Sequence, residues 1–186
     1  MKEELKKCIE VLRNGGTILY PTDTIWGIGC DATNKEAVQK VFDIKRRPSS
    51  KSMIVLLAEP GQISFYADTP SVALDLVEHT QLPLTIIYPK AKGLAKALIA
   101  EDGSIAIRVV KDEFCRQLIN ALRKPLVSTS ANISGEPAPV NFYEISDTIK
   151  ANVDYVVNLR QNETHKSAPS RILKIAMDGT IETIRK

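Results

Sequence analysis

The fold is organised around the stretch Ile44-Lys45-Arg46-Arg47-Pro48-Ser49-Ser50-Lys51-Ser52-Met53. A proline disfavours the helical conformation in the residue before it, so a helix arriving from upstream should end near Arg47. Four of the seven residues from Lys45 to Lys51 are cations, and the apolar run 53–57 that follows predicts a buried strand. The cations either converge on one anion or form a solvated helix end that the helix dipole favours.

Upstream of this stretch, the sequence predicts a helix, a strand, a polar segment and a second helix. Apolar residues recur at helical spacing over 5–12, and a short strand spans 17–20. The segment Pro21–Asp31 is rich in side-chain oxygens, which at a strand end can bind a small polar ligand or cap the next element. Asn34 is the expected N-cap of the helix that leads into Lys45.

Downstream of it, strands and helices alternate. The expected strands are 84–88, 104–109, 126–127 and 155–159, and the expected helices begin near 70, 94, 114 and 143. A hairpin joins 172–176 to 181–184 around Gly179. This alternation predicts an α/β fold with a mixed sheet. Because no shift in composition marks a boundary, we expect a single domain over 1–186.

Two later stretches place polar side chains in or directly after a predicted strand. Arg108 alternates with Ile105 and Ile107, so it lies either at a sheet edge, which we favour from the residues alone, or in a ligand cleft. The segment 128–134 is rich in hydroxyl and amide groups and follows the strand 126–127. It is either a polar turn or a binding loop, since ligands collect at the carboxyl ends of strands in α/β sheets.

Composition limits the class of protein. The chain has 186 residues, 44% of them hydrophobic and 25% charged, with a net charge of +3, which is too mild for a dedicated nucleic-acid binder. Cys8, Cys30 and Cys115 are far apart and odd in number, so we expect reduced thiols in a cytoplasmic protein. His79 and His165 form neither a zinc site nor a triad. The N-terminus predicts a charged helix, not a signal peptide, and no apolar run is long enough to span a membrane.

Four segments together resemble the YrdC family, whose members are bacterial threonylcarbamoyl-AMP synthases and longer two-domain relatives. The segments are Pro21–Gly27, Lys45–Pro48, Ser104–Arg108 and Lys124–Gly135. The combination of Lys-x-Arg with Ser-x-Asn at this separation is specific, whereas either pair alone would be weak. The resemblance implies a twisted mixed sheet with flanking helices around a positively charged concave cleft.

The resemblance also implies a reaction. Members of the family condense L-threonine, bicarbonate and ATP into threonylcarbamoyl-AMP and pyrophosphate. The product passes to a tRNA threonylcarbamoyl transferase complex, which makes N6-threonylcarbamoyladenosine at position 37 of tRNA. Mg²⁺ would accompany the ATP, and the sequence identifies no protein ligand for it.

Site residues carry over by motif. The catalytic set is Lys45, Arg47, Ser130 and Asn132. The ATP-binding set is Arg47, Lys51, Ser104, Asn132, Ser170 and Arg185, and the threonine-binding set is Thr24, Arg108 and Ser130. Two departures from the two-domain relatives are expected: Leu56 stands where they have a histidine near the threonine, and their second domain is missing.

Two alternatives use the same cations for another purpose. One is a double-stranded RNA-binding or ribosome-assembly module, and a weak tRNA or RNA contact through the basic cleft is also compatible with synthase activity. Aromatic residues make up only 5% of the chain and none interrupts the basic stretch, which disfavours RNA binding alone. The other is a paralogue that adenylates a different small carbamate, as hydrogenase-maturation proteins with this fold do.

Overall fold

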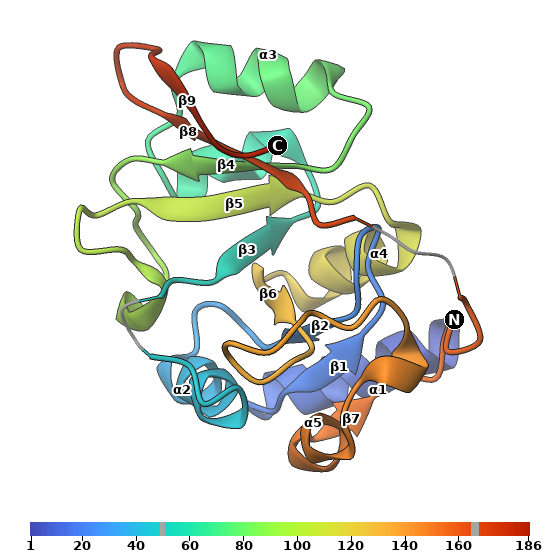
Figure 1. Ribbon diagram of the computed structural model, residues 1–186. Coiled ribbons are helices and arrows are strands. Elements are labelled where there is room, and N and C mark those ends of the chain that lie inside the picture. Colours follow the sequence, from blue (N-terminus) through green and yellow to red (C-terminus); the bar gives the residue numbers. More distant parts are fainter. Residues whose placement is uncertain (49–50, 165–167) are drawn as a thin grey trace.

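The computed structural model describes residues 1–48, 51–164 and 168–186, so His165 lies outside the described residues. One mixed sheet of nine strands runs through the molecule in the order β7-β1-β2-β6-β3-β5-β4-β8-β9 (Figure 1). The strands are β1 (Ile18–Tyr20), β2 (Gly27–Gly29), β3 (Ile54–Leu57), β4 (Leu84–Tyr88), β5 (Ile105–Val109), β6 (Leu126–Ser130), β7 (Tyr155–Val156), β8 (Arg171–Ile175) and β9 (Ile181–Arg185). The mixed α/β fold predicted from the sequence is confirmed.

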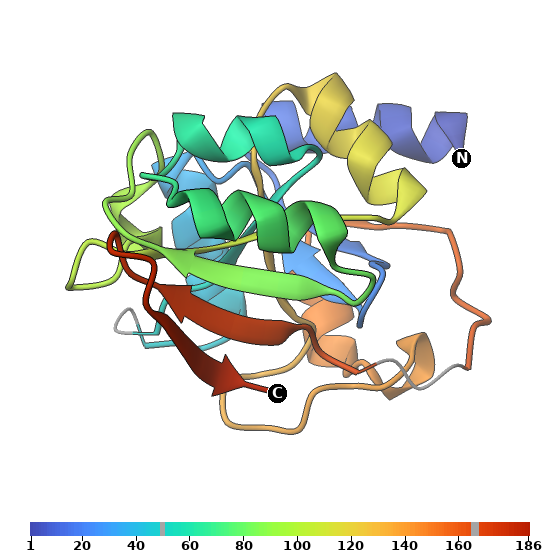
Figure 2. The same ribbon diagram turned by 90° about the horizontal axis from the view of Figure 1, so that it is seen from above.

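Helices flank this sheet. They are α1 (Lys2–Arg13), α2 (Lys35–Ile44), α3 (Ser71–His79), α4 (Glu113–Leu122) and α5 (Asp147–Asn152), with 3₁₀ helices at Pro60–Phe65, Lys96–Leu98 and Phe142–Glu144. Figure 2 shows α3 on one side of strands β4, β8 and β9, and the loop after β6 on the other.

The core has two apolar clusters on opposite faces of the sheet. Alternation along β3 places Val55 and Leu57 in the first cluster and Leu56 in the second. Helices α2 and α3 contribute to the first cluster, and α1 and α4 to the second. Free cysteines are buried in both, as expected for reduced thiols.

Strand β5 lies between β3 and β4, parallel to the former and antiparallel to the latter. Arg108 therefore belongs to an interior strand and is only 4% exposed. The edge position that we favoured for Arg108 is wrong. The ladder of β5 is satisfied by neighbours on both sides, and the arginine points out of the sheet plane.

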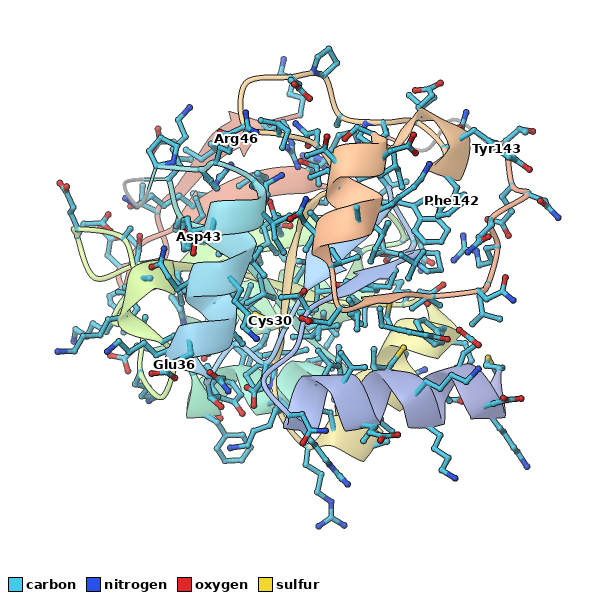
Figure 3. All side chains as sticks on the ribbon, turned by 90° about the horizontal axis from the view of Figure 1, so that it is seen from below. Cys30, Glu36, Asp43, Arg46, Phe142 and Tyr143 are labelled. Atoms are coloured by element: carbon cyan, nitrogen blue, oxygen red, sulfur yellow. The ribbon has the colours of Figure 1, made fainter. Side chains whose placement is uncertain are left out.

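Helix α2 ends earlier than the proline alone predicts. Its last residue is Ile44, and Arg46 adopts a left-handed conformation with φ 48°. The Arg47 amide donates to Phe42 O at 2.9 Å and the Arg46 amide to Asp43 O at 3.0 Å, which is the pattern of a Schellman motif. The turn aims consecutive side chains in different directions: Arg46 is exposed at the end of α2 (Figure 3), whereas Arg47 is half-buried.

Several predicted boundaries differ in the structure, among them the strand expected over 155–159, which is only Tyr155–Val156. A strand, β2, lies inside the polar segment 21–31, and β6 continues to Ser130 through part of the predicted loop. Gly29 allows this close pairing, since a Cβ there would lie 2.5 Å from Val127 O and 2.7 Å from the Tyr20 ring. The helix expected from residue 143 is two separate pieces, because Asn141 and Ser146 each cap a new start.

Candidate active site

A cavity of about 360 Å³ opens over the carboxyl end of β6 and the adjoining parts of β3, β5, β8 and β9. It lies on the face of the sheet that carries Ala106 and Arg108 of β5. Six of the predicted site residues line it: Thr24, Arg47, Arg108, Ser130, Ser170 and Arg185. The structure thus brings together residues that are up to 161 positions apart in the sequence, from Thr24 to Arg185.

One end of the cavity is built on Arg108. Its Nη1 donates to Thr24 Oγ1 at 2.9 Å, and its Nη2 lies 3.2 Å from Asp23 Oδ1. Thr22 Oγ1 in turn lies 2.9 Å from Thr24 Oγ1 and accepts from the Thr24 amide at 3.0 Å. The Nε of Arg108 is buried and has no hydrogen-bond partner among the described residues. The guanidinium is therefore oriented by side chains, with donor capacity left over for an anion.

A second group of cations is held by main-chain oxygens. Arg47 donates from Nε to Lys51 O and from Nη2 to Ser52 O, each at 2.9 Å. Arg185 donates from Nε and Nη2 to Ser170 O at 2.9 and 2.7 Å. Burial lowers the pKa of both guanidinium groups, and the charge of Arg108 lowers that of Arg185 further. The charge of Arg108 therefore acts on Arg185, which lines the same cavity.

Lys45 lies behind the cavity wall and does not line it. Its side chain is 1% exposed, and its Nζ donates to Ser130 O and, at 2.6 Å, to Asn132 O. The Lys45 carbonyl accepts from the Ser134 amide at 2.8 Å. Burial, together with the charge of Arg47, lowers the pKa of Lys45 to about 7. Lys45 thus holds the end of β6 and the loop that follows it in place through hydrogen bonds.

Asn132 supports the same loop from within. Its Nδ2 donates to Ile133 O at 3.0 Å and to Glu136 O at 2.7 Å, while its Oδ1 is buried without a partner among the described residues. Like Lys45, it does not line the cavity. The Lys-x-Arg and Ser-x-Asn motifs are therefore in direct contact in the structure, with one member of each, Arg47 and Ser130, at the cavity surface.

Ser104 faces an adjoining cavity of about 540 Å³ that shares Ser52, Ile87, Ala106 and Ile184 with the first. Its hydroxyl donates to Asp102 Oδ1 at 2.5 Å. A hydrogen bond from Lys174, followed by those from Ser104, lowers the pKa of Asp102 to about 2. Lys51 is exposed, and its main-chain carbonyl accepts the hydrogen bond from Arg47 Nε.

The remaining wall is apolar. Ile25, Trp26, Ile172 and Ile184 line it, and Trp26 packs on Phe142 with ring centroids 4.8 Å apart. Figure 3 shows Phe142 beside Tyr143, which is 65% exposed.

The described lining of the cavity offers no carboxylate ligand for a magnesium ion. Among the described residues that line the cavity there is no aspartate or glutamate, and the nearby Asp23 carboxylate is paired with Arg108. No cluster of three or more His, Cys, Asp or Glu side chains in the described part of the chain is placed to hold a metal ion. No helix among the described residues is both long and apolar enough to cross a membrane.

A family model described as "Telomere recombination" (Sua5/YciO/YrdC) matches residues 10–186. The chain belongs to the Sua5/YciO/YrdC family. Within it, the chain is 36% identical over 185 residues to the putative threonylcarbamoyl-AMP synthase of Methanocaldococcus jannaschii, covering 97% of this chain and 86% of that one. It is 34% identical over 155 residues to the threonylcarbamoyl-AMP synthase of Psychromonas ingrahamii, covering 81% of each.

Solved structures of the Sua5/YciO/YrdC family share the fold. E. coli YciO superposes with a TM-score of 0.86 at 24% identity, covering 100% of this chain and 90% of that one. P. abyssi Sua5 complexed with L-threonine superposes with a TM-score of 0.86 at 24% identity over 94% of this chain. The match covers 52% of that Sua5 chain, so this chain spans about half its length.

Two site residues of this family member, Asp23 and Thr22, were missed in the sequence. They hold the Arg108 end together, and the signal for them was their position in the polar segment 21–31 beside Thr24. Leu56, for which the resemblance implies a histidine in the two-domain relatives, is fully buried and stands opposite Arg108 in the β3–β5 register.

Proposed function

We propose that this protein is a threonylcarbamoyl-AMP synthase, which condenses L-threonine, bicarbonate and ATP into threonylcarbamoyl-AMP and pyrophosphate. The names of relatives at 30–36% identity over most of the chain support this function. The observation that carries it is the cavity itself, whose described lining residues include three arginines, several hydroxyls and no carboxylate. Such a surface suits a polyanionic nucleotide beside an amino-acid carboxylate.

The reaction requires charge stabilisation more than proton transfer. The threonine amine adds to bicarbonate with loss of water, giving a carbamate. A carbamate oxygen then attacks the α-phosphorus of ATP, and the bond to the leaving pyrophosphate breaks. Because the nucleophile is already an anion, this step needs no strong base. It needs cations and donors in place as charge develops on the phosphorus and the leaving group.

The described residues divide this task. Arg47 and Arg185 would bind the phosphates, while Arg108, with Thr24, would bind the threonine carboxylate. Ser130 lines the same cavity and would donate to the reacting groups. Lys45 and Asn132 would hold the Ser130 loop in place, and Lys45 contributes part of a positive charge near neutral pH.

The nucleoside would extend toward Ser104, since the two cavities adjoin through Ser52, Ala106 and Ile184. Ser170 would contact the nucleotide beside Arg185, which it holds. Lys51 would approach the phosphates from the exposed side. We propose that Mg²⁺ enters with ATP, bound through phosphate oxygens and water, because the described lining residues supply no carboxylate for it.

The side chain of the substrate would contact Thr24, Ile25 and Trp26. One methyl group in an apolar pocket is worth about 1–3 kcal/mol, so serine should be disfavoured by roughly 10–200-fold and not excluded. We further propose that the enzyme is cytoplasmic and that its product passes to a tRNA threonylcarbamoyl transferase complex, to which the buried free thiols and the family membership lend support.

The test is pyrophosphate release measured with each substrate omitted in turn. We expect release only when threonine, bicarbonate and ATP are all present. Brisk ATP turnover without threonine, or equal rates with serine, would contradict the assignment and favour a paralogue that acts on another carbamate.

A further inference from the structure

The three arginines that line the cavity differ in their partners. Arg47 and Arg185 donate to main-chain oxygens, and neither forms an ion pair with a carboxylate among the described residues. Arg108 differs because its Nη2 lies 3.2 Å from Asp23 Oδ1. The charges of Arg47 and Arg185 are therefore not neutralised by a carboxylate in the described part of the chain, whereas the charge of Arg108 is paired with that of Asp23.

Asp23 is held in place behind Arg108. Its side chain is 15% exposed and is not part of the cavity lining. Its Oδ2 accepts from the Lys111 amide at 3.4 Å, and its Oδ1 has no other partner among the described residues than the Arg108 ion pair. Arg160 anchors the same loop, since its Nη1 donates to Thr22 O at 3.3 Å and to Asp112 Oδ2 at 2.8 Å.

We propose that Asp23 is a specificity-determining positioning residue that keeps the phosphates of ATP away from the amino-acid end of the cavity. This inference rests on the proposed function. Asp23 does not contact substrate and acts only through Arg108. Its negative charge cancels most of the positive charge that a distant polyanion would experience. The guanidinium N–H donors of Arg108 still point toward the amino-acid carboxylate.

The two substrates depend to different degrees on the charge and on the shape of the Arg108 guanidinium. Coulomb attraction grows with the product of the charges, so an unpaired Arg108 would attract a triphosphate far more strongly than a single carboxylate. A carboxylate gains a large part of its binding from the planar, directional hydrogen bonds of the guanidinium. Neutralising Arg108 therefore lowers the affinity of Arg108 for the polyphosphate more than its affinity for the threonine carboxylate. As a result, threonine binds at Arg108 and the phosphates bind at the other end of the cavity.

The first measurement is the dependence of the threonine KM on ATP concentration. In the wild type we expect a threonine KM that is independent of ATP once the nucleotide site is filled. In Asp23→Asn, which keeps the shape and loses the charge, ATP should compete at Arg108. The threonine KM should then rise by about tenfold between low and high ATP, within the range of ordinary coupling between two sites.

Matched variants separate this effect from general damage. Asp68→Asn removes the same charge from an exposed ion pair with Lys90 and Lys92 away from the cavity, and it should behave as the wild type. Asp23→Glu restores the charge and should restore independence from ATP. A threonine KM in Asp23→Asn that is unchanged, or that is raised equally at all ATP concentrations, would overturn the proposal.

The second measurement needs no turnover. Calorimetry with inorganic pyrophosphate should show an additional binding event in Asp23→Asn that L-threonine displaces and that Asp23→Asn/Arg108→Met lacks. Identical pyrophosphate isotherms in the wild type and in folded Asp23→Asn would overturn the proposal. Failure of the proposed function would look different: the wild type itself would release no pyrophosphate in a threonine-dependent manner.

Discussion

Arg108 and Arg47 line the same cavity, but different kinds of structure hold them. Arg108 rises from the middle of an interior strand, is 4% exposed and is oriented by the side chains of Thr24 and Asp23. Arg47 follows a helix end, is half-buried and donates to the carbonyls of residues 51 and 52. The strand end of the site is thus preformed by packing, whereas the helix end depends on the geometry of a turn.

This contrast matches the two ligands that we assign. A small carboxylate gains from a rigid, directional fork, because preorganisation lowers the entropy that binding costs. A triphosphate has many oxygens and several charges, so it tolerates cations held on a turn. Variants at the two ends should therefore fail in different ways.

The largest effect on stability is expected at the strand end, from Arg108→Ala, which should also weaken threonine binding. Removing one partner of a buried ion pair leaves Asp23 uncompensated and should lower the free energy of unfolding by about 3 kcal/mol. The threonine KM should rise by about 30-fold or more, since truncating a buried charge contact typically costs roughly 2 kcal/mol or more of binding. Steady-state kinetics and urea denaturation measure both.

ATP binding serves as the control for this variant. If ATP affinity collapses in Arg108→Ala while the threonine KM is unchanged, the roles of the two ends have been assigned the wrong way round.

A smaller effect on stability, with a clear loss of turnover, is expected at the helix end. Arg47→Ala should leave the fold intact and lower kcat by about 10²–10³-fold, the loss of one preorganised electrostatic contact worth roughly 2.7–4 kcal/mol. Arg47→Lys should recover only part of it, because a point charge replaces a bidentate fork. Circular dichroism and pyrophosphate release measure the two expectations.

Arg46 provides the matched control. It is the adjacent cation, but its left-handed conformation directs it to the exposed end of α2. Arg46→Ala should therefore change kcat much less than Arg47→Ala. Equal and mild losses at both positions would return this segment to a solvated basic helix end.

The smallest expected effect is a pH dependence at Lys45, which links the two motifs. Its pKa is lowered to about 7, first by burial, whereas in the unfolded chain it is about 10.4. Between these values the unfolded state binds more protons, so the contribution of Lys45 to stability should increase as pH rises through this window. The slope should be at most about 1.4 kcal/mol per pH unit.

Urea denaturation of the wild type and of Lys45→Met at pH 6.5 and 9 measures this contribution. The stability of the wild type relative to the variant should increase with pH. A difference that is constant, or that shrinks as pH rises, would mean that Lys45 is an ordinary solvated cation.

The sequence alone determined the family and most of the order of elements, with β2 as an exception. Hydrophobic periodicity located α1, α2 and α4, while residue type located the Asn34 cap and the turn around Gly179 located the C-terminal hairpin. All of these signals are local, since they depend on residues no more than a few positions apart. The motifs also named six residues that the fold brings to one cavity.

Only the tertiary structure decided what each of these residues contacts. Whether Arg108 lies at an edge or in a cleft depends on which strands pair with β5, and these pairings join residues far apart in the chain. In the same way, the burial of Lys45 against the carbonyls of Ser130 and Asn132, and the ion pair of Asp23 with Arg108, span 85 or more positions. Such contacts leave no periodic trace in the sequence, because they are set by how the elements pack and not by the spacing of residues along any one element.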